Sequence, residues 1–326
     1  MPDLPVNAGP DASSWPALPY VEWADTCAGL QLCTQIVGKY RLAHTPWLNH
    51  SWHATLYPTS RGLTTGPVPD GDVTLTLTFD LSEHVLIGET VGRRERFHLE
   101  PMSVADFLER TTMLVERLGG RMKINGVPNE VPDPVAFAVD KGVRPYDRDA
   151  VERFHAIILA VERVFARFRT GFLGKVSPVH LFWGSFDLAV TRFSGKRAPL
   201  HPGGVPGLPD DVTREAYSHE VSSAGFWPGG GGVTEPMFYS YAYPSPQGFA
   251  DAPVEPASAR FDPNLGEFLL PYEAVRTSAD PKRELMRFLQ STYAAAANLS
   301  GWDRQTLECG PGVPGVPRRV LAPVSG

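Results

Sequence analysis

The chain has 326 residues, of which 42% are hydrophobic, and a formal net charge of −6 at pH 7. This hydrophobic content is enough for the packed core of one large domain or two. The acidic balance and the lack of a long run of Lys and Arg argue against a nucleic-acid partner.

The N-terminal residues have neither a basic start nor an apolar stretch, and no apolar run approaches the length of a membrane span. We therefore expect a cytoplasmic protein without a membrane partner. The three cysteines agree with a reducing compartment, because any pairing into disulfides leaves one over.

Four helices are predicted from hydrophobic spacing and capping residues. Ser103 has Asp106 three residues later, a variant of the capping box, and Gly119 ends the apolar stripe that follows. Asp280 and Pro281 form the N-cap and first-turn pair that is typical of a helix start. The predicted helices cover residues 20–37, 103–119 and 147–171, and a fourth begins at residue 280.

Residues 73–79 alternate strictly between apolar side chains and threonine, and a short turn leads to a second strand at 84–90. This pattern predicts an antiparallel hairpin with one face toward solvent. In the second half of the chain, the candidate strands are residues 180–192, 215–224, 237–243 and 266–272.

One motif occurs twice, at residues 38–62 and 174–195. In each copy a Gly-Lys pair ends a predicted helix, a His-containing stretch leads to a Trp, and an Arg follows that Trp by nine residues. A chance match is the alternative, because the gap from Lys to Trp differs, 13 residues against 8. The paired positions are Lys39 and Lys175, Trp52 and Trp183, and Arg61 and Arg192.

These elements predict an α+β fold with two similar halves of antiparallel sheet flanked by helices. An internal duplication would relate the halves by a pseudo-twofold axis and would leave a cleft between them, where small molecules usually bind. Both chain ends are rich in Pro and Gly, which is typical of disorder. The expected organisation is a disordered N-terminus (1–14), a first half (15–130), a connector (131–146), a second half (147–308) packed on the first as one domain, and a disordered tail (309–326).

If residues 180–192 form one strand, His180 and Arg192 share an otherwise apolar face, since alternate side chains of a strand point to the same side. Asp187 then lies on the opposite face. The same alternation predicts three further groups that share a face: His53 with Tyr57 and Arg61, His219 with Tyr217 and Val221, and Tyr239 with Tyr241 and Tyr243.

Burying an unpaired Arg is unfavourable, so Arg61 and Arg192 on core-like faces indicate a bound carboxylate or phosphate. The alternative is that each Arg lies at a strand end with its charge in solvent. We therefore expect a small-molecule site with two kinds of residue. The proton-transfer candidates are His53, His180, His219 and Tyr57, and the substrate-binding candidates are Arg61, Arg192, Lys39, Lys175, Trp183 and Tyr241.

A divalent metal is a second expectation for this site, because imidazole and carboxylate groups are common metal ligands. The candidate ligands are His53, His180, His219 and Glu220. The alternative is that these histidines are core or surface residues satisfied by hydrogen bonds. No nucleotide fingerprint, nucleophile elbow or HExxH zinc motif occurs.

The sequence thus favours an enzyme that acts on a small anionic molecule between the two halves, by His-based acid–base or metal-assisted chemistry. A binding or sensing protein that uses the same aromatic and Arg pocket without turnover is the alternative. A third hypothesis is an assembly component that exposes residues 224–232 to a partner.

Several long strings are similar to one known family. HLFWGSFDLAVTRFSG, SHEVSSAGFWPGGGG, FYSYAYP, WLNHSWH and RGLTTGPVP resemble an uncharacterised family of bacterial proteins that is described as a domain of unknown function. The resemblance extends from about Trp15 to Glu308. It implies a bacterial source and a one-domain organisation, and it assigns no catalytic residue.

Overall fold

The computed structural model describes residues 15–318, so the disorder expected at 1–14 and 319–326 concerns residues outside this range. Residues 309–318 are described, and the Cys309 amide donates a hydrogen bond of 3.2 Å to the carbonyl of Gly171. The helices are α1 (Tyr20–His44), α2 (Val104–Arg117), α3 (Arg148–Arg169), α4 (Asp210–Ala216), α5 (Tyr272–Arg276), α6 (Pro281–Leu299) and α7 (Arg304–Leu307), with short 3-10 turns η1 (Asn49–Ser51), η2 (Phe137–Val139) and η3 (Phe249–Asp251).

The strands form two six-stranded antiparallel sheets, which confirms the predicted α+β class. In the first sheet the order is β1-β2-β4-β5-β6, and β3 pairs with β4. Its strands are β1 (Tyr57–Thr59), β2 (Gly62–Thr64), β3 (Val68–Asp70), β4 (Val73–Asp80), β5 (Val85–Thr90) and β6 (Arg93–His98). The second sheet has the order β11-β12-β10-β9-β8-β7, and its strands are β7 (His180–Phe182), β8 (Asp187–Arg197), β9 (His219–Trp227), β10 (Met237–Tyr243), β11 (Arg260–Asp262) and β12 (Glu267–Pro271).

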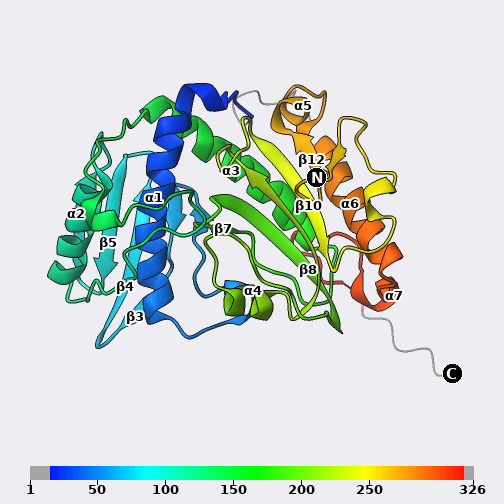
Figure 1. Cartoon of the computed structure of the whole chain (residues 1–326), viewed down its shortest axis with the longest axis horizontal. Coiled ribbons are helices and arrows are strands. Elements are labelled where there is room, and N and C mark those ends of the chain that lie inside the picture. Colours follow the sequence, from blue (N-terminus) through cyan, green and yellow to red (C-terminus); the bar gives the residue numbers. More distant parts are fainter. Residues whose placement is uncertain (1–14, 319–326) are drawn as a thin grey trace, which may run out of the picture.

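The two sheets meet at their first strands. Leu56, just before β1, and Leu181 of β7 form an antiparallel bridge with hydrogen bonds of 3.0 and 2.8 Å between their backbones. Both leucines are fully buried. Figure 1 shows the first sheet on the left and the second on the right, with this junction between them.

Helix α3 supports both sheets from one side. It contacts β1 and β8 and packs against α6, which contacts β9 and β10. The Nε2 atom of His155 on α3 lies 3.1 Å from the carbonyl oxygen of Thr59 in β1. In Figure 1 this helix passes behind the strands of the second sheet. One face of the second sheet is therefore covered by helices, and the opposite face is left for other contacts.

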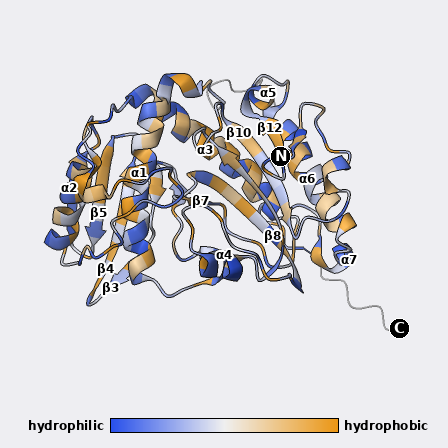
Figure 2. Cartoon of the chain, viewed as in Figure 1, coloured by the Kyte–Doolittle hydropathy of each residue, from blue (hydrophilic) through white to orange (hydrophobic). Residues whose placement is uncertain are grey.

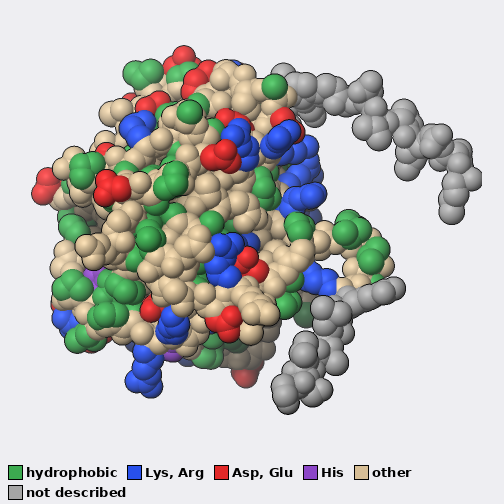
Figure 3. All heavy atoms as spheres, turned by 90° about the vertical axis from the view of Figure 1, so that its right-hand side faces the viewer, with side chains coloured by type: hydrophobic (Ala, Val, Ile, Leu, Met, Phe, Trp, Pro, Cys, Tyr) green, Lys and Arg blue, Asp and Glu red, His purple; other side chains and the backbone are tan. Residues whose placement is uncertain are grey.

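The hydropathy pattern follows these layers. In Figure 2 hydrophobic residues recur along the strands and on the helices that lie beside them. Figure 3 views the molecule from the right-hand side of Figure 1, where basic and acidic side chains lie beside one another. Arg287 of α6 pairs with Glu255 at 2.8 Å. No helix within residues 15–318 is long and apolar enough to cross a membrane.

The helix starts and the hairpin are confirmed. Ser103 and Asp106 form a complete capping box, with the Asp106 amide donating to Ser103 Oγ at 3.0 Å. Asp147 and Asp280 accept hydrogen bonds from the first turns of α3 and α6. Strands β4 and β5 pair antiparallel, and Leu75, Leu77 and Phe79 are buried while the threonines between them are not.

The Gly-Lys pair at residues 38–39 does not end a helix. Helix α1 continues to His44, seven residues beyond the predicted end at Val37. Gly38 is needed for a close contact instead, because a Cβ atom added there would overlap the indole ring of Trp183. The absence of a side chain is thus explained by packing between two distant segments and not by a helix C-cap.

The expectation of one strand over residues 180–192 is wrong. Residues 183–186 form a tight turn between β7 and β8, with Phe186 in a left-handed conformation (φ 58°). In the antiparallel register His180 lies opposite Ala189, so it shares a face with the odd-numbered residues of β8. His180 and Arg192 therefore point to opposite faces of the sheet, and His180 shares its face with Asp187.

The predicted strand 215–224 is also only partly correct. Residues up to Ala216 belong to α4, and β9 begins at His219. Pro209 precedes α4, and Asp210 and Asp211 lie in its first turn, where acidic side chains favour the helix dipole. In β9 His219 and Glu220 are neighbours and so point to opposite faces.

The structure does not show a duplication. Both halves have the order helix, strands, helix. The paired motif positions, however, occupy different elements: Lys39 is inside α1 and Lys175 is in the loop after α3, and Arg61 is in a turn whereas Arg192 is inside β8.

Candidate functional site

Two of the candidate catalytic histidines are buried near the junction of the sheets. His180 is fully buried, its Nδ1 atom lies 3.2 Å from Thr55 Oγ1, and its Nε2 atom has no hydrogen-bond partner among residues 15–318. His53 is 5% exposed and accepts a hydrogen bond of 3.1 Å from the Leu48 amide. Neither imidazole is positioned at an open surface.

Aromatic rings surround these histidines. The ring of His180 lies 4.7 Å from that of Phe182 and 6.4 Å from that of Trp52, and the buried His50 packs edge-on against Phe182 and Phe193. Burial lowers the pKa of His50 to about 4 and that of His180 well below its usual value. Both are therefore neutral core residues at physiological pH.

The candidate Tyr57 is engaged by its neighbours. Its hydroxyl donates a hydrogen bond of 3.4 Å to the Trp52 carbonyl, and the Arg41 guanidinium lies 4.9 Å from its ring centroid. His219 is only half-buried and its Nδ1 atom lies 3.1 Å from Ser218 Oγ. Within residues 15–318, no group of three or more His, Cys, Asp and Glu side chains is arranged to hold a metal.

The two candidate anion-binding arginines lie in different environments. Arg61 is 53% exposed and pairs with Asp80 and, at 3.4 Å, with Glu83. Arg192 is 1% exposed and faces the helices. Its guanidinium carbon lies 3.5 Å from the ring centroid of Phe168 and 4.3 Å from that of Tyr293, and burial lowers its pKa to about 10. The structure does not bring these two side chains together.

The two candidate lysines each lie over the tryptophan of the other motif copy. Lys39 Nζ is 5.4 Å from the Trp183 ring centroid, and Lys175 Nζ is 5.0 Å from that of Trp52. Lys39 donates to Asn129 Oδ1 and Lys175 to Asn49 Oδ1. Lys39 is 4% exposed, and burial lowers its pKa to about 8. The indole of Trp183 donates to the Ala54 carbonyl at 2.7 Å, so this tryptophan joins the two halves.

The second sheet has a polar face opposite its helices, which we call the tyrosine face. It carries Asp187 of β8, Tyr239 and Tyr241 of β10, and Glu267 of β12. The strand register places them there. Side chains that pair across neighbouring strands lie on the same face, and the paired residues across the sheet are Ala189, Gly225, Tyr239 and Leu269. Asp187, Tyr241 and Glu267 are each two residues along the strand from one of these four, so they share that face.

Hydrogen bonds connect this face. Tyr239 and Ser185 both donate to the carboxylate of Asp187, which is 3% exposed. The hydroxyls of Tyr217 and Tyr241 lie 2.7 Å apart. One carboxyl oxygen of Glu267, Oε2, is buried without a partner among the described residues. Polar groups of this kind, gathered outside the main core, are typical of a binding site.

The carboxyl groups on this face have perturbed protonation. Burial and the charge of Asp187 raise the pKa of Glu267 to about 8, and the same two causes raise the pKa of the nearby Glu130 to about 7. Burial also raises the pKa of Asp187 itself. Among the described residues no basic side chain offsets these three carboxyl groups. Such perturbed groups concentrate at functional sites.

Aromatic side chains complete the face. Trp227 of β9 lies over Tyr239 with 4.4 Å between ring centroids, and Tyr239 stacks on Tyr241 at 6.1 Å. Together with Met237 and Leu269 they form a hydrophobic cluster separate from the main core. Trp227 and Tyr241 are half-buried and so remain accessible. The tyrosine face is therefore the best candidate for a functional site.

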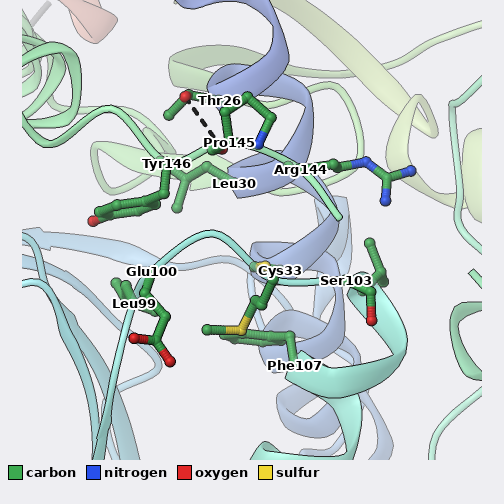
Figure 4. A pocket seen from close by; sticks show the side chains of 13 residues that line it. Thr26, Leu30, Cys33, Leu99, Glu100, Ser103, Phe107, Arg144, Pro145 and Tyr146 are labelled. Atoms are coloured by element: carbon green, nitrogen blue, oxygen red, sulfur yellow. Dashed lines mark hydrogen bonds between the residues drawn. The ribbon is translucent and has the colours of Figure 1, made fainter. Parts of the chain in front are cut away.

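A small cavity lies elsewhere, between α1 and the start of α2. Its volume is about 30 Å³, and side chains of α1, α2 and residues 144–146 meet around it (Figure 4). Cys33 lines it, and burial raises the pKa of this thiol to about 12, which makes it unreactive. None of the predicted site residues lines this cavity.

Sequence reasoning identified Tyr241 and missed most of the tyrosine face. The alternation of residues 237–243 correctly places Tyr239 beside Tyr241. Asp187 and Glu267 come from other strands, and only the register of the assembled sheet brings them to the same side. The alternating tyrosines of residues 237–243 are the one sequence signal that pointed here.

Comparison with known proteins identifies a family whose function is unknown. No curated protein and no solved structure matches the chain. A model of a family of unknown function, DUF5996, matches residues 15–309, which include both sheets and all seven helices of the described chain. This confirms the resemblance found in the sequence. The chain therefore belongs to the DUF5996 family of unknown function.

Proposed function

We propose that this protein binds a small organic cation, such as an amine or a quaternary ammonium compound, on the tyrosine face. The observation that carries the proposal is the excess of carboxyl groups there. Asp187 and Glu267 are held among tyrosines with no basic partner among the described residues. A buried carboxylate without a counter-ion is unfavourable, and a bound cation would supply that counter-ion.

The aromatic rings support the same ligand class. A cation placed over the face of a Trp or Tyr ring is attracted by the π electrons, with about 0.5 to 2 kcal/mol per contact. Trp227, Tyr239 and Tyr241 present such rings beside the carboxyl groups, and two of the three are half-exposed. A surface of aromatic rings beside acidic groups is suited to a cation and repels an anion.

The enzyme expected from the sequence, acting on a small anion, stays a prediction. It relies on Arg61 and Arg192 as anion ligands, and these are engaged by Asp80 and by the rings of Phe168 and Tyr293. The alternative of a binding protein that uses the aromatic residues is closer to this proposal, with the charge of the ligand reversed. A divalent metal at His53, His180, His219 and Glu220 is not part of it.

The test is calorimetric titration of the full chain with tetramethylammonium, phenethylammonium and butane-1,4-diammonium at pH 6, 7 and 8. We expect binding that strengthens from pH 6 to 8, because the ligand favours ionised carboxylates whose pKa values lie at or above neutrality. Tert-butanol, which is neutral and similar in shape to tetramethylammonium, should bind weakly at every pH, and benzoate should not bind.

Glu267→Gln is the matched variant, since it removes the charge and keeps the shape. We expect about a tenfold loss of affinity for the best cation, about 1.4 kcal/mol. Glu255→Gln, an exposed carboxylate on the other side of the molecule paired with Arg287, is the control and should bind as wild type. Lack of binding by all three cations at pH 8, or equal binding by Glu267→Gln, would refute the proposal.

A further inference from the structure

We propose that residues 127–133, here called the strap, form a gate over the tyrosine face, which Glu130 holds closed when it is protonated or when a cation lies between it and Asp187. This inference rests on the proposed function for the ligand that the gate admits. The gate itself is argued from the seating of Glu130 and is tested without ligand.

The strap is fastened by Asn129. Its amide donates to Gln35 Oε1 and its carbonyl accepts from Gln35 Nε2, each at 2.8 Å. The side chain of Asn129 accepts from Lys39 and donates to the Gly207 carbonyl at 2.8 Å. These bonds link the strap to α1 on one side and to the loop before α4 on the other. None of these bonds goes to a strand, so we expect the strap to detach without breaking the pairing of either sheet.

Glu130 is inserted from this strap into a slot made by two glycines. A Cβ atom on Gly184 would overlap its carboxyl group, and one on Gly207 would lie 2.5 Å from its backbone nitrogen. The backbone of Glu130 is left-handed (φ 55°), a conformation that costs free energy for a residue other than glycine. The slot therefore holds a strained residue whose side chain points toward Asp187.

The charges around Glu130 make the burial of its side chain between Gly184 and Gly207 dependent on pH. Asp187 faces it from β8, Tyr217 faces it from the end of α4, and the ammonium of Lys39 on α1 bonds to the neighbouring Asn129. Burial and Asp187 raise the pKa of Glu130 to about 7, compared with its usual value near 4.5. Closure is therefore favoured in acid and is weakened as the pH rises from about 4.5 to 7.

Hydrogen exchange of the Asn129 amide, read in a peptide that covers the strap, measures this opening directly. The full chain without ligand is compared at pH 5.5 and 8.0, with rates corrected by an unprotected reference peptide. We expect protection to fall by at least about tenfold at pH 8.0, the effect of one pKa unit of coupling. Adding tetramethylammonium at pH 8.0 should restore it.

Glu130→Gln should keep the strap equally protected at both pH values, because it cannot ionise. If Glu130→Gln fails to fold, Asp187→Asn is the second variant: it removes one of the two causes of the raised pKa and leaves burial, so we expect a smaller pH dependence than in the wild type. Asp133→Asn, an exposed acid of the same strap, is the control and should retain the pH dependence. Equal corrected protection of the wild type at both pH values would overturn the gate.

Hydrogen exchange with added tetramethylammonium distinguishes the gate from the proposed function. Loss of protection at high pH without any effect of the cation would keep the gate and count against the proposed function. If the protein binds cations but the hydrogen-exchange protection of its strap does not depend on pH, the proposed function is kept and the gate is ruled out.

Discussion

The guanidinium of Arg192 lies over the ring of Phe168, with 3.5 Å between its central carbon and the ring centroid. It also donates a hydrogen bond to the carbonyl of Phe168. Lysine lacks the planar, delocalised guanidinium that makes close contact with aromatic rings. We expect Arg192→Lys to reduce the free energy of unfolding by about 1 to 3 kcal/mol, measured by urea denaturation.

Arg61→Lys is the control for this substitution, because Arg61 is half-exposed and solvent screens its ion pairs, so its free energy of unfolding should stay close to that of the wild type. Because Arg192 faces the helices, Arg192→Lys should leave the binding of tetramethylammonium unchanged. A normal unfolding midpoint combined with weakened binding would mean that Arg192 acts at the site and not in the core.

Gly38 and Gly29 allow a test of packing within one helix. Alanine is favoured over glycine in a helix by about 1 kcal/mol, so both Gly→Ala changes in α1 should stabilise the protein if only propensity mattered. At Gly29 the nearest atoms to an added Cβ lie 3.4 Å away. At Gly38 the added atom would overlap Trp183. We expect Gly29→Ala to raise Tm and Gly38→Ala to cost about 1 to 3 kcal/mol.

The buried histidines should make the fold sensitive to acid. The pKa of His50 is lowered to about 4 from an unfolded value of 6.5. The stability that this difference contributes is present above pH 6.5 and is lost as the pH falls toward 4. His50→Asn tolerates the same left-handed backbone (φ 62°) and removes the titrating group. Its free energy of unfolding should fall less than that of wild type between pH 6.5 and 4.5.

Glu267 should have the opposite effect on stability. Its pKa is raised to about 8, so the stability that it contributes is present below about pH 4.5 and is lost as the pH rises to 8. Thermal unfolding at pH 8.5 should show Glu267→Gln to be more stable than wild type, by roughly 2 kcal/mol or more. A variant that is less stable than wild type at pH 8.5 would show that Glu267 is ionised and paired in the folded protein.

Local signals could be predicted from the sequence and distant contacts could not. The Ser103 and Asp106 capping box and the strand alternation at 73–79 depend on neighbours within a few residues, and both are confirmed. The turn at 183–186 is different, because a left-handed phenylalanine at 186 is rarely expected. Missing this turn reversed the face assigned to Arg192 relative to His180.

The candidate site shows the same limit. Tyr239 and Asp187 are 52 residues apart and meet only when β8, β9 and β10 have paired in register. Glu267 arrives from a fourth strand. The sequence shows three tyrosines on one side of β10, but the carboxyl groups that determine the charge of a ligand come from strands whose alignment depends on the whole sheet.

The bridge between Leu56 and Leu181 determines how the two halves depend on each other. Leu56 immediately precedes the first strand of one sheet and Leu181 lies in the first strand of the other, and their pairing covers two backbone edges that would otherwise be open. An open strand edge is a template for pairing with another chain. Either half expressed alone would present such an edge together with the apolar surface of a buried leucine, so we expect the separate halves to self-associate, and the intact chain to be protected from aggregation by its own internal junction.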